Sequence, residues 1–330
     1  MPTAGAVSVV IPAQNAGAWI AETISSVVAQ SAREQIESIC VVDDGSSDDT
    51  ASIAAAALAR TGIAHTVVRA NGVGPSAARN LGWRHSRAPW LQFLDADDLL
   101  MPTKIERQLA AAIGLAEDVA VVYSPWSDLH SEGGVWTPAE WLRDPRIGAD
   151  TLADQLENEN FIATGSQLFR RAWLERVGGF DERLRLIEDV DLLLRLAIAG
   201  ARFVRVPSAQ PLFLYRRHPQ SASWRDARAW TRANLRNLQL VEEHWRQHGA
   251  LTSERARWLA CKRFDTGRAL AEGDRPDFDA HVDHLYALWP GFVPPAPRTL
   301  RWLTRAIGYR RAERVAVHYR RLKGARATAH

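Results

Sequence analysis

Two clusters of acidic residues follow short apolar segments of the chain. The apolar segment 38–42 leads directly into Asp43 and Asp44, and a second one, 90–94, leads into acids at 95–98. Carboxylates crowded at one place repel one another unless a cation or hydrogen-bond donors compensate their charge. A divalent ion bound through carboxylate and diphosphate oxygens would supply that compensation. The alternative is that both clusters are polar turns and helix caps, for which Asp and Gly are also suited.

A third acidic group, Glu188 and Asp189 with Asp191 close behind, stands at the start of a predicted helix, 189–199. The helix dipole favours acids in a first turn, so a purely structural role also explains them. Their value as indicators of chemistry therefore depends on the other two clusters.

Strands and helices must alternate to bring these acids together. Apolar runs predict the strands, and apolar residues at helical spacing predict the helices. We expect strands at 7–12, 38–42, 65–69, 90–94 and 119–123, and helices at 18–30, 50–60, 76–85 and 102–115. This alternation predicts an α/β fold with a mostly parallel sheet covered on both faces. Ligands of such sheets bind beyond the carboxyl ends of the strands, where the first two clusters would lie.

The pattern loosens between residues 124 and 160, where glycine and proline interrupt it. We expect a long functional loop there. Order returns at 165–170 and continues with the helix 189–199 and strands at 203–206 and 212–216, and the chain reads as helical from about 223. The sequence therefore predicts an α/β part at 1–222 and a helical part at 223–330.

The composition is that of a globular protein. The chain has 330 residues, of which 46% are apolar and 24% charged, enough for one large domain or two ordinary ones. Cys40 and Cys261 fit neither a metal-ligand spacing nor a disulfide framework, which favours a reducing cytoplasm. Since no segment offers the roughly 18 uncharged apolar residues of a membrane span, we expect a soluble protein.

Positive charge is concentrated at the C-terminal end. Residues 301–330 contain nine Lys or Arg and one acid, Glu313, with Trp302 and Tyr319 among the apolar residues between them. This mixture predicts a helix that lies against an anionic membrane surface. The alternative is a solvated basic helix packed on the rest of the protein. Since no recognised motif accompanies the charge, we expect no nucleic-acid partner.

Seven segments in order resemble glycosyltransferase family 2. They are VSVVIPAQN (7–15), VDDGSSDDT (42–50), GPSAARNLG (74–82), FLDADD (93–98), GGFDE (178–182), EDVDLLLRL (188–196) and YRRH (215–218). The resemblance runs from about residue 7 to 223. It implies the GT-A fold, a Rossmann-like mixed sheet that binds nucleotide-diphospho-sugars, followed here by a C-terminal helical extension.

The resemblance implies donor-binding roles at matching positions. Asp43 would read the nucleotide base, with Pro12 and Asn15 lining the same pocket. Arg79 would contact the diphosphate. Asp95 would point toward the ribose as the first acid of the DxD pair.

The resemblance also implies the reacting groups. Asp97, the second DxD acid, would hold Mn²⁺ or Mg²⁺ on the diphosphate with His218 nearby, although His218 is equally compatible with a surface or core histidine. Asp189 resembles the catalytic base, which would take a proton from an acceptor hydroxyl and allow attack with inversion.

Tryptophan faces can stack on sugar rings. Since the loosened segment 124–160 contains Trp126, Trp136 and Trp141, we expect these residues at the acceptor, together with Glu188.

The implied protein is an inverting transferase that uses a UDP- or GDP-type donor. Its acceptor would be a glycan or a lipid-linked sugar in bacterial surface glycan synthesis, at the cytoplasmic face of the membrane. The strongest rival is an NAD(P)-dependent oxidoreductase, because residues 72–77 fit G-x-G-x-x-A. That match falls on the third strand and leaves the acidic clusters unexplained. A nucleotide-sugar pyrophosphorylase would carry a glycine-rich loop with an arginine directly after the first strand, but residues 12–15 are Pro-Ala-Gln-Asn. A non-catalytic relative that only binds a sugar nucleotide stays open as an alternative.

Overall fold

The computed structural model describes residues 6–218, 226–273 and 275–327. The chain forms two compact units, Met1–Ser221 and Ala222–His330, called unit 1 and unit 2 below. The domain boundary predicted at 222 and the last three residues of the basic tail lie outside the described residues.

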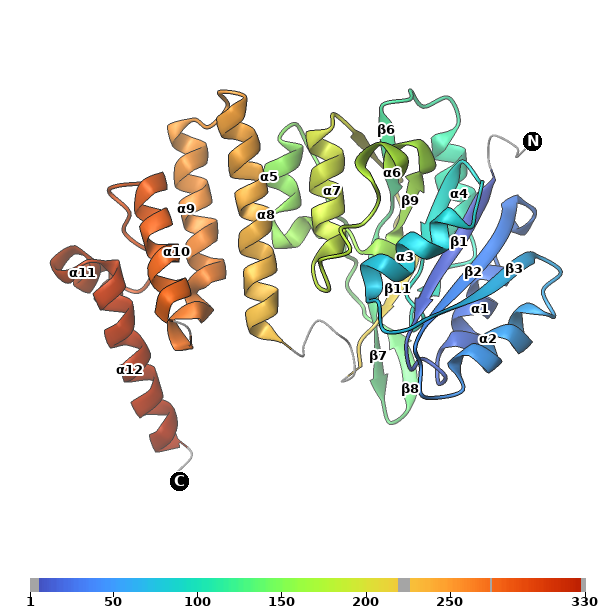
Figure 1. Cartoon of the computed structure of the whole chain (residues 1–330), viewed down its shortest axis with the longest axis horizontal. Coiled ribbons are helices and arrows are strands. Elements are labelled where there is room, and N and C mark those ends of the chain that lie inside the picture. Colours follow the sequence, from blue (N-terminus) through green and yellow to red (C-terminus); the bar gives the residue numbers. More distant parts are fainter. Residues whose placement is uncertain (1–5, 219–225, 274, 328–330) are drawn as a thin grey trace. The chain divides into compact units, whose positions relative to one another are not determined.

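Unit 1 is built on a seven-stranded sheet in the order β10-β6-β9-β4-β1-β2-β3 (Figure 1). Its strands are β1 (Val7–Ala13), β2 (Ile36–Asp44), β3 (Ala64–Ala70), β4 (Trp90–Phe93), β6 (Val119–Tyr123), β9 (Gln167–Arg170) and β10 (Arg202–Arg205). β1 is parallel to β2 and β4, whereas β9 is antiparallel to both β4 and β6. The mixed α/β sheet confirms the predicted fold class.

Helices cover both faces of this sheet, because successive strand residues point to opposite sides. Val9 and Ile11 of β1 pack with α1, α2 and α4 on one face, whereas Val10 packs with α3, α6 and α7 on the other (Figure 1). These helices are α1 (Ile20–Val28), α2 (Thr50–Leu58), α3 (Pro75–Arg84), α4 (Lys104–Ala112), α6 (Arg171–Val177) and α7 (Glu188–Ile198). The short helix α5 (Thr151–Gln155) lies in the segment expected to be a loop.

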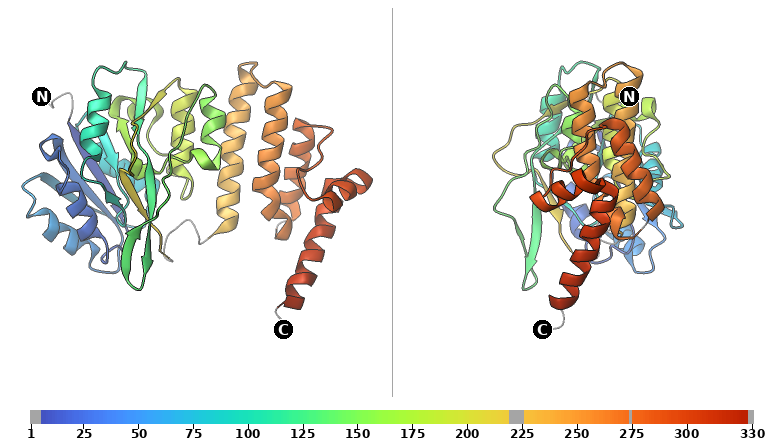
Figure 2. Two further views of the ribbon diagram at one scale, coloured as in Figure 1. Left: turned by 180° about the vertical axis from the view of Figure 1, so that it is seen from behind. Right: turned by 90° about the vertical axis from the view of Figure 1, so that its left-hand side faces the viewer.

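A second sheet has four strands in the order β5-β11-β7-β8. Its strands are β5 (Leu99–Leu100), β7 (Trp126–Glu132), β8 (Val135–Pro138) and β11 (Phe213–Arg216). β7 and β8 form an antiparallel hairpin that turns at Gly133 and Gly134, both with positive φ, and projects from the unit (Figure 2). The predicted loop is wrong for 126–138, because the two glycines that seemed to break structure form a hairpin turn.

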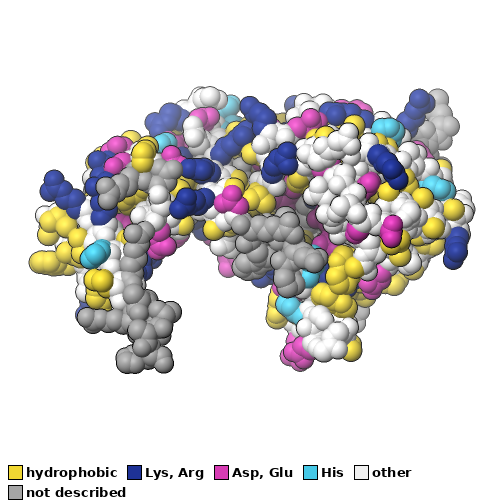
Figure 3. All heavy atoms as spheres, turned by 60° about the horizontal axis from the view of Figure 1, so that its bottom comes forward, with side chains coloured by type: hydrophobic (Ala, Val, Ile, Leu, Met, Phe, Trp, Pro, Cys, Tyr) yellow, Lys and Arg dark blue, Asp and Glu magenta, His cyan; other side chains and the backbone are white. Residues whose placement is uncertain are grey.

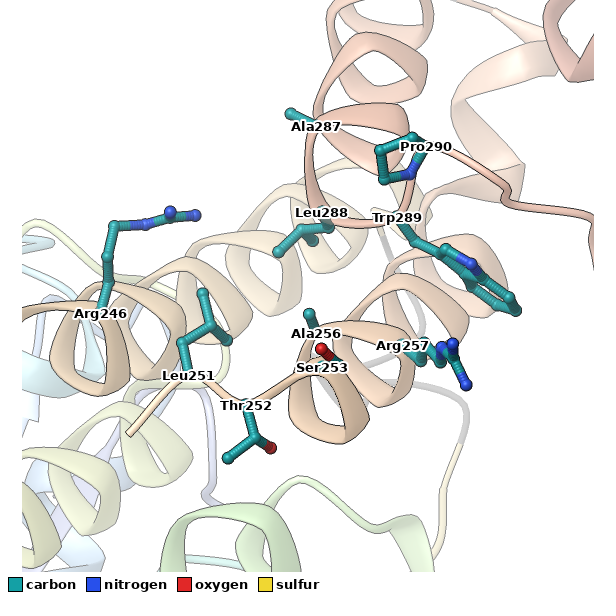
Figure 4. Close-up of a pocket in the computed structure, with 10 residues that line it drawn as sticks. All are labelled: Arg246, Leu251, Thr252, Ser253, Ala256, Arg257, Ala287, Leu288, Trp289 and Pro290. Atoms are coloured by element: carbon teal, nitrogen blue, oxygen red, sulfur yellow. The ribbon is translucent and has the colours of Figure 1, made fainter. Parts of the chain in front are cut away.

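Unit 2 is helical, as the sequence predicts. Its helices are α8 (Ala227–Gln247), α9 (Ser253–Gly267), α10 (Arg275–Leu288), α11 (Arg298–Ile307) and α12 (Tyr309–Ala327). Asp226 and Thr252 cap α8 and α9 by accepting hydrogen bonds from first-turn amides. A cavity of about 280 Å³ opens between the end of α8, the start of α9 and the end of α10, with Arg257 and Trp289 in its wall (Figure 4).

Among the side chains that the structure describes, those of the basic helix α12 that pack against the rest of unit 2 recur at helical spacing along one face, at positions 309, 312, 313 and 317. Tyr309 is fully buried against Phe264, Phe278 and Phe292. On other faces of α11 and α12, large apolar side chains are exposed, among them Trp302 at 69%. Figure 3 draws one face of this unit, on which yellow apolar and dark-blue basic side chains lie next to one another. Among the described residues, no helix is long and apolar enough to cross a membrane.

Candidate active site

Arg79 of α3 joins the second and third acidic groups. Its Nη2 donates to Asp95 Oδ1 at 2.6 Å, and its Nη1 donates to Glu188 Oε1 at 2.6 Å. Asp95 follows β4, and Glu188 opens α7, so the two ion pairs hold the end of a strand and the start of a helix at the same edge of the sheet. The structure therefore brings acids of the second and third groups together around one guanidinium.

The structure shows the partners of Arg79 and Glu188. The Arg79 side chain is 5% exposed and each Nη atom donates to a carboxylate, and its expected contact with a diphosphate stays a prediction. The Glu188 side chain is paired with Arg79 and is 11% exposed, and its expected contact with the acceptor also stays a prediction. Both residues fix the acidic cluster from within. Their mutual pairing was invisible in the sequence, because they are 109 positions apart.

Asp189 has the least committed carboxylate of the α7 acids. Its Oδ1 accepts a hydrogen bond from the Val190 amide at 2.8 Å, and its Oδ2 lies 3.4 Å from the Thr164 hydroxyl. Burial and the neighbouring Glu188 charge raise the Asp189 pKa to about 7, against the opposing effect of Arg79. A carboxyl that titrates near neutral pH is suited to accept a proton in general-base catalysis.

Ile187 brings Asp189 into place through an unusual backbone conformation. Ile187 is the residue before α7 and has φ +61°, in the left-handed region. For a β-branched residue this conformation costs on the order of 1–3 kcal/mol and persists only where the surrounding structure fixes it. The strain therefore lies directly beside the candidate base.

In the acidic loop after β4, Asp97 pairs with His218, which follows β11. His218 Nε2 lies 2.7 Å from Asp97 Oδ2, while the other imidazole nitrogen, Nδ1, is buried with no partner among the described residues. Asp98 is buried and accepts a hydrogen bond from the Arg216 amide at 2.8 Å. Burial, with the charges of Asp97 and Asp95, holds the Asp98 pKa well above its usual range. Burial also raises the Asp95 pKa, although Arg79 opposes the shift.

An aromatic cluster borders this pair. The Trp19 ring lies 5.3 Å from the Trp136 ring and 5.7 Å from His218, measured between centroids. The Arg216 guanidinium stacks against both indoles at 4.6 and 4.5 Å. Trp136 of β8 thus belongs to the same site as Asp97, which keeps it a candidate for acceptor contact.

The other two tryptophans expected at the acceptor differ in exposure. Trp126 is 1% exposed and packs between Phe161 and Tyr215, so it has no free face for a sugar, and that expectation is corrected. Trp141 is exposed, and its ring is stacked on Arg143.

The ends of β1 and β2 bring the residues of the predicted base pocket together. Pro12 lies in register beside the last residues of β2, which include Asp43. Asn15 has φ +52°, and its Oδ1 accepts a hydrogen bond from the Ser47 amide at 2.8 Å. Its own amide donates to the Ser46 hydroxyl at 2.9 Å. Pro12, Asn15 and Asp43 therefore border one place.

Asp44, the neighbour of Asp43, has a structural role. Its carboxylate accepts hydrogen bonds from the Val73 and Gly74 amides at 2.7 and 2.8 Å. These amides belong to the glycine-rich stretch that fits a dinucleotide-binding fingerprint. Since an anionic side chain of the protein already occupies them, they are not free to hold a pyrophosphate, and the oxidoreductase interpretation loses its main support.

Trp19, Thr164 and Arg216 are site residues that the sequence did not assign. Arg216 lies within the YRRH segment, which was the available signal. Thr164 precedes β9, and because β9 is antiparallel, its start rather than its end lies at the ligand edge. An apolar run in the sequence does not show the direction of a strand. The sequence therefore gave no indication that Thr164 lies at the edge of the sheet where the acids gather.

Together, the mixed sheet, the helices on its two faces and the carboxylates gathered at one edge are those of a GT-A fold. Comparisons with known proteins agree. The family model described as "Glycosyl transferase family 2" matches residues 8–178, just over half of the chain. The chain belongs to glycosyltransferase family 2.

Individual proteins are similar to this chain at low to moderate sequence identity. Succinoglycan biosynthesis protein ExoU of Rhizobium meliloti (strain 1021) is 32% identical over 226 residues, which are 66% of this chain and 65% of ExoU. The match thus spans just under two thirds of that relative. Residues 1–349 of S. aureus TarS in complex with UDP align with TM-score 0.63 at 18% identity, over 93% of this chain and 90% of that one. Mannosyltransferase PcManGT from Pyrobaculum calidifontis, in complex with GDP-Man and Mn²⁺, aligns with TM-score 0.50 at 19% identity, over 96% and 86%.

Proposed function

We propose that this chain transfers a sugar from a UDP- or GDP-type donor to a hydroxyl of a glycan or lipid-linked acceptor, with inversion. The observation that carries the proposal is Asp189, a carboxyl with pKa about 7 that belongs to one acidic cluster with the DxD acid Asp95. Family membership and the similarity to ExoU, a succinoglycan biosynthesis protein, support surface glycan synthesis. The proposed location is the cytoplasmic face of the membrane.

In this reaction Asp189 takes the proton of the acceptor hydroxyl. The hydroxyl oxygen then attacks the anomeric carbon from the face opposite the leaving group, so that the configuration inverts. The charges of Glu188 and Arg79 act in opposite directions on the Asp189 pKa, which burial raises most. Only one carboxylate is needed as a base, unlike the two of a glycoside hydrolase.

Asp97 and His218 fit a divalent ion such as Mn²⁺ or Mg²⁺. The Asp97 carboxylate and the His218 Nε2 that faces it at 2.7 Å are suitable donor atoms for an ion that replaces the hydrogen bond between them. When bound, the ion would compensate the negative charge of the diphosphate as it leaves. Among the described residues, no three His, Cys, Asp or Glu side chains form a complete cage. This arrangement suits an ion that takes further ligands from the diphosphate.

The donor's nucleoside would lie at the ends of β1 and β2. We assign the base to Asp43 with Pro12 and Asn15, and the ribose to Asp95, whose side chain remains one third exposed. Trp136, and Trp141 further along the same segment, are the remaining candidates for the acceptor.

A thermal-shift screen tests the proposal. A ligand that binds only the folded state raises the unfolding temperature, and at a given concentration a tighter ligand raises it further. UDP, GDP and their sugars with Mn²⁺ or Mg²⁺ are expected to stabilise the protein, whereas NADH is not. Stabilisation by NADH alone would contradict the proposed function.

Asp97→Ala is expected to abolish the metal-dependent part of nucleotide binding. Without this carboxylate the ion loses a ligand, and affinity for UDP or GDP in Mn²⁺ should fall on the order of tenfold or more. Calorimetry with and without Mn²⁺ measures the effect. Asp118→Ala, which removes an exposed carboxylate paired with Arg202, is the control. Unchanged affinity with an intact metal requirement would move the metal site elsewhere.

We also propose that α11 and α12 hold the enzyme against an anionic membrane surface. Trp302 is exposed on α11, and the exposed Arg298, Arg301 and Arg305 of the same helix form no ion pair among the described residues. Each basic residue near such a surface contributes about 1 kcal/mol. Removal of α11 and α12 would not be a clean test, because Tyr309 is part of the core of unit 2.

Replacing these three arginines with glutamine is expected to weaken binding to anionic vesicles on the order of a hundredfold at low salt. Sedimentation with vesicles measures the change. Glutamine at Arg84, Arg183 and Arg202, exposed arginines of unit 1 in surface ion pairs, is the matched control. Equal sedimentation of the two triple variants would show that this surface is not an anchor.

A further inference from the structure

Arg216 of β11 binds the acidic loop at two points. Its backbone amide donates to Asp98 Oδ1 at 2.8 Å, and its Nε donates to the Asp97 carbonyl oxygen at 2.6 Å. Two positions further along the chain, His218 lies 2.7 Å from the Asp97 carboxylate. The segment 216–218 therefore fixes both the main chain and the side chain of Asp97.

The same guanidinium contacts two other parts of unit 1. Its Nη2 donates to Glu22 Oε2 of α1 at 2.7 Å. Its plane lies against Trp19, which precedes α1, and Trp136 of the β7–β8 hairpin, at 4.6 and 4.5 Å from the ring centroids. The two indoles are nearly perpendicular to one another, so the guanidinium fills the corner between them.

The Arg216 side chain is fully buried, and one of its donors has no partner in the described part of the chain. Its side chain has no exposed surface, and Nη1 has no hydrogen-bond partner among the described residues. A buried donor left without a partner destabilises a protein, and such groups are expected where geometry serves a function. Lysine would retain the charge but has neither the planar fork nor the stacking surface.

We propose that Arg216 is a positioning residue for the metal end of the site and links the Asp97–Asp98 loop to the β7–β8 hairpin. Through Trp136 it sets the wall of the site, and through the Asp97 carbonyl it sets the carboxylate expected to hold the divalent ion. This inference rests on the proposed function. It assigns to Arg216 an effect on metal and nucleotide affinity although Arg216 itself contacts neither.

The test compares Arg216→Lys with Arg217→Lys. Arg217 is the next residue and also forms an ion pair, to Asp128 at 2.9 Å, with its guanidinium stacked on Tyr215. UDP binding is titrated by calorimetry at increasing Mn²⁺ without acceptor. The Mn²⁺ concentration at half-saturation is expected to rise about tenfold or more in Arg216→Lys, as for other residues that orient a metal ligand. In Arg217→Lys it should change less than twofold.

Hydrogen exchange without any ligand gives a second readout. The Asp98 amide, which donates to the Asp95 carbonyl at 3.1 Å, is expected to exchange faster in Arg216→Lys than in Arg217→Lys. If Arg216→Lys does not fold, Trp136→Leu replaces it, because this substitution removes one stacking partner on a projecting hairpin. The expected direction of both readouts is the same.

A folded Arg216→Lys or Trp136→Leu variant with unchanged half-saturating Mn²⁺ and unchanged exchange would overturn the inference. In that case wild-type binding of UDP would leave the proposed function intact. If the wild type binds no nucleoside diphosphate with any divalent ion, the proposed function fails and the inference fails with it.

Discussion

Replacing Asp189 with asparagine is expected to lower the turnover rate by roughly a hundredfold or more, the usual effect of removing a general base. The substitution keeps the shape of the side chain and its contact with the Val190 amide but cannot take up a proton. Donor affinity should change little, because the proposed role of Asp189 is toward the acceptor. Initial rates and UDP affinity of the purified variant measure the two effects separately.

The pH dependence of kcat/KM provides an independent check. Because the Asp189 pKa is raised to about 7, the carboxylate form is lost as the pH falls through that value, and the wild-type rate should fall with it. Asp189→Asn should lack this limb. Asp191→Asn is the control on the same helix, since Asp191 is bound to Arg195 at 2.7 Å and has a structural role. A near-normal rate in Asp189→Asn would move the base to another residue.

Replacing Arg79 with leucine is expected to reduce the free energy of unfolding of unit 1 by about 3–5 kcal/mol, the range for breaking a buried ion pair from one side. Among the described residues, Arg79 is the one basic side chain that forms an ion pair with Asp95 and with Glu188. Without its guanidinium, the negative charges of both carboxylates remain uncompensated. Chemical denaturation measures the loss. An unfolding free energy of about 5–15 kcal/mol is typical, so the change is large.

Arg84→Leu on the same helix is the matched control. Arg84 pairs with Glu182 at 3.5 Å, but both side chains are about half exposed, so this variant should lose no more than about 1 kcal/mol. Adding Asp95→Asn and Glu188→Gln to Arg79→Leu should restore much of the stability, because no unpaired buried charge remains. Equal stability of the two single variants would contradict a structural role for Arg79.

The sequence was most informative where the sheet is parallel and buried. Strands covered on both faces appear as uninterrupted apolar runs, so β1, β2, β4 and β6 were predicted within two residues of their ends. The β7–β8 hairpin was missed because its outer half is exposed and its turn is a Gly-Gly pair. The reversed direction of β9 was also missed, since direction depends on what a strand pairs with.

Within the site, the types of residue were predictable but their partners were not. The motifs indicated which acids gather at the sheet edge. They did not show that Arg79 turns inward to bind two of those acids, or that Arg216 lies in the corner between Trp19 and Trp136. These contacts join positions up to about two hundred residues apart and arise only when the helices pack on the sheet.

The adjacent acids Asp43 and Asp44 show how a two-letter motif can carry two unrelated constraints. Neighbouring residues of a pleated strand point to opposite sides, so the pair cannot serve one partner. Asp44 accepts hydrogen bonds from the amides of Val73 and Gly74, while Asp43 lies in register beside the end of β1. One acid of the pair thus fixes the shape of a loop, whereas the other lies where the base of the donor is proposed to bind.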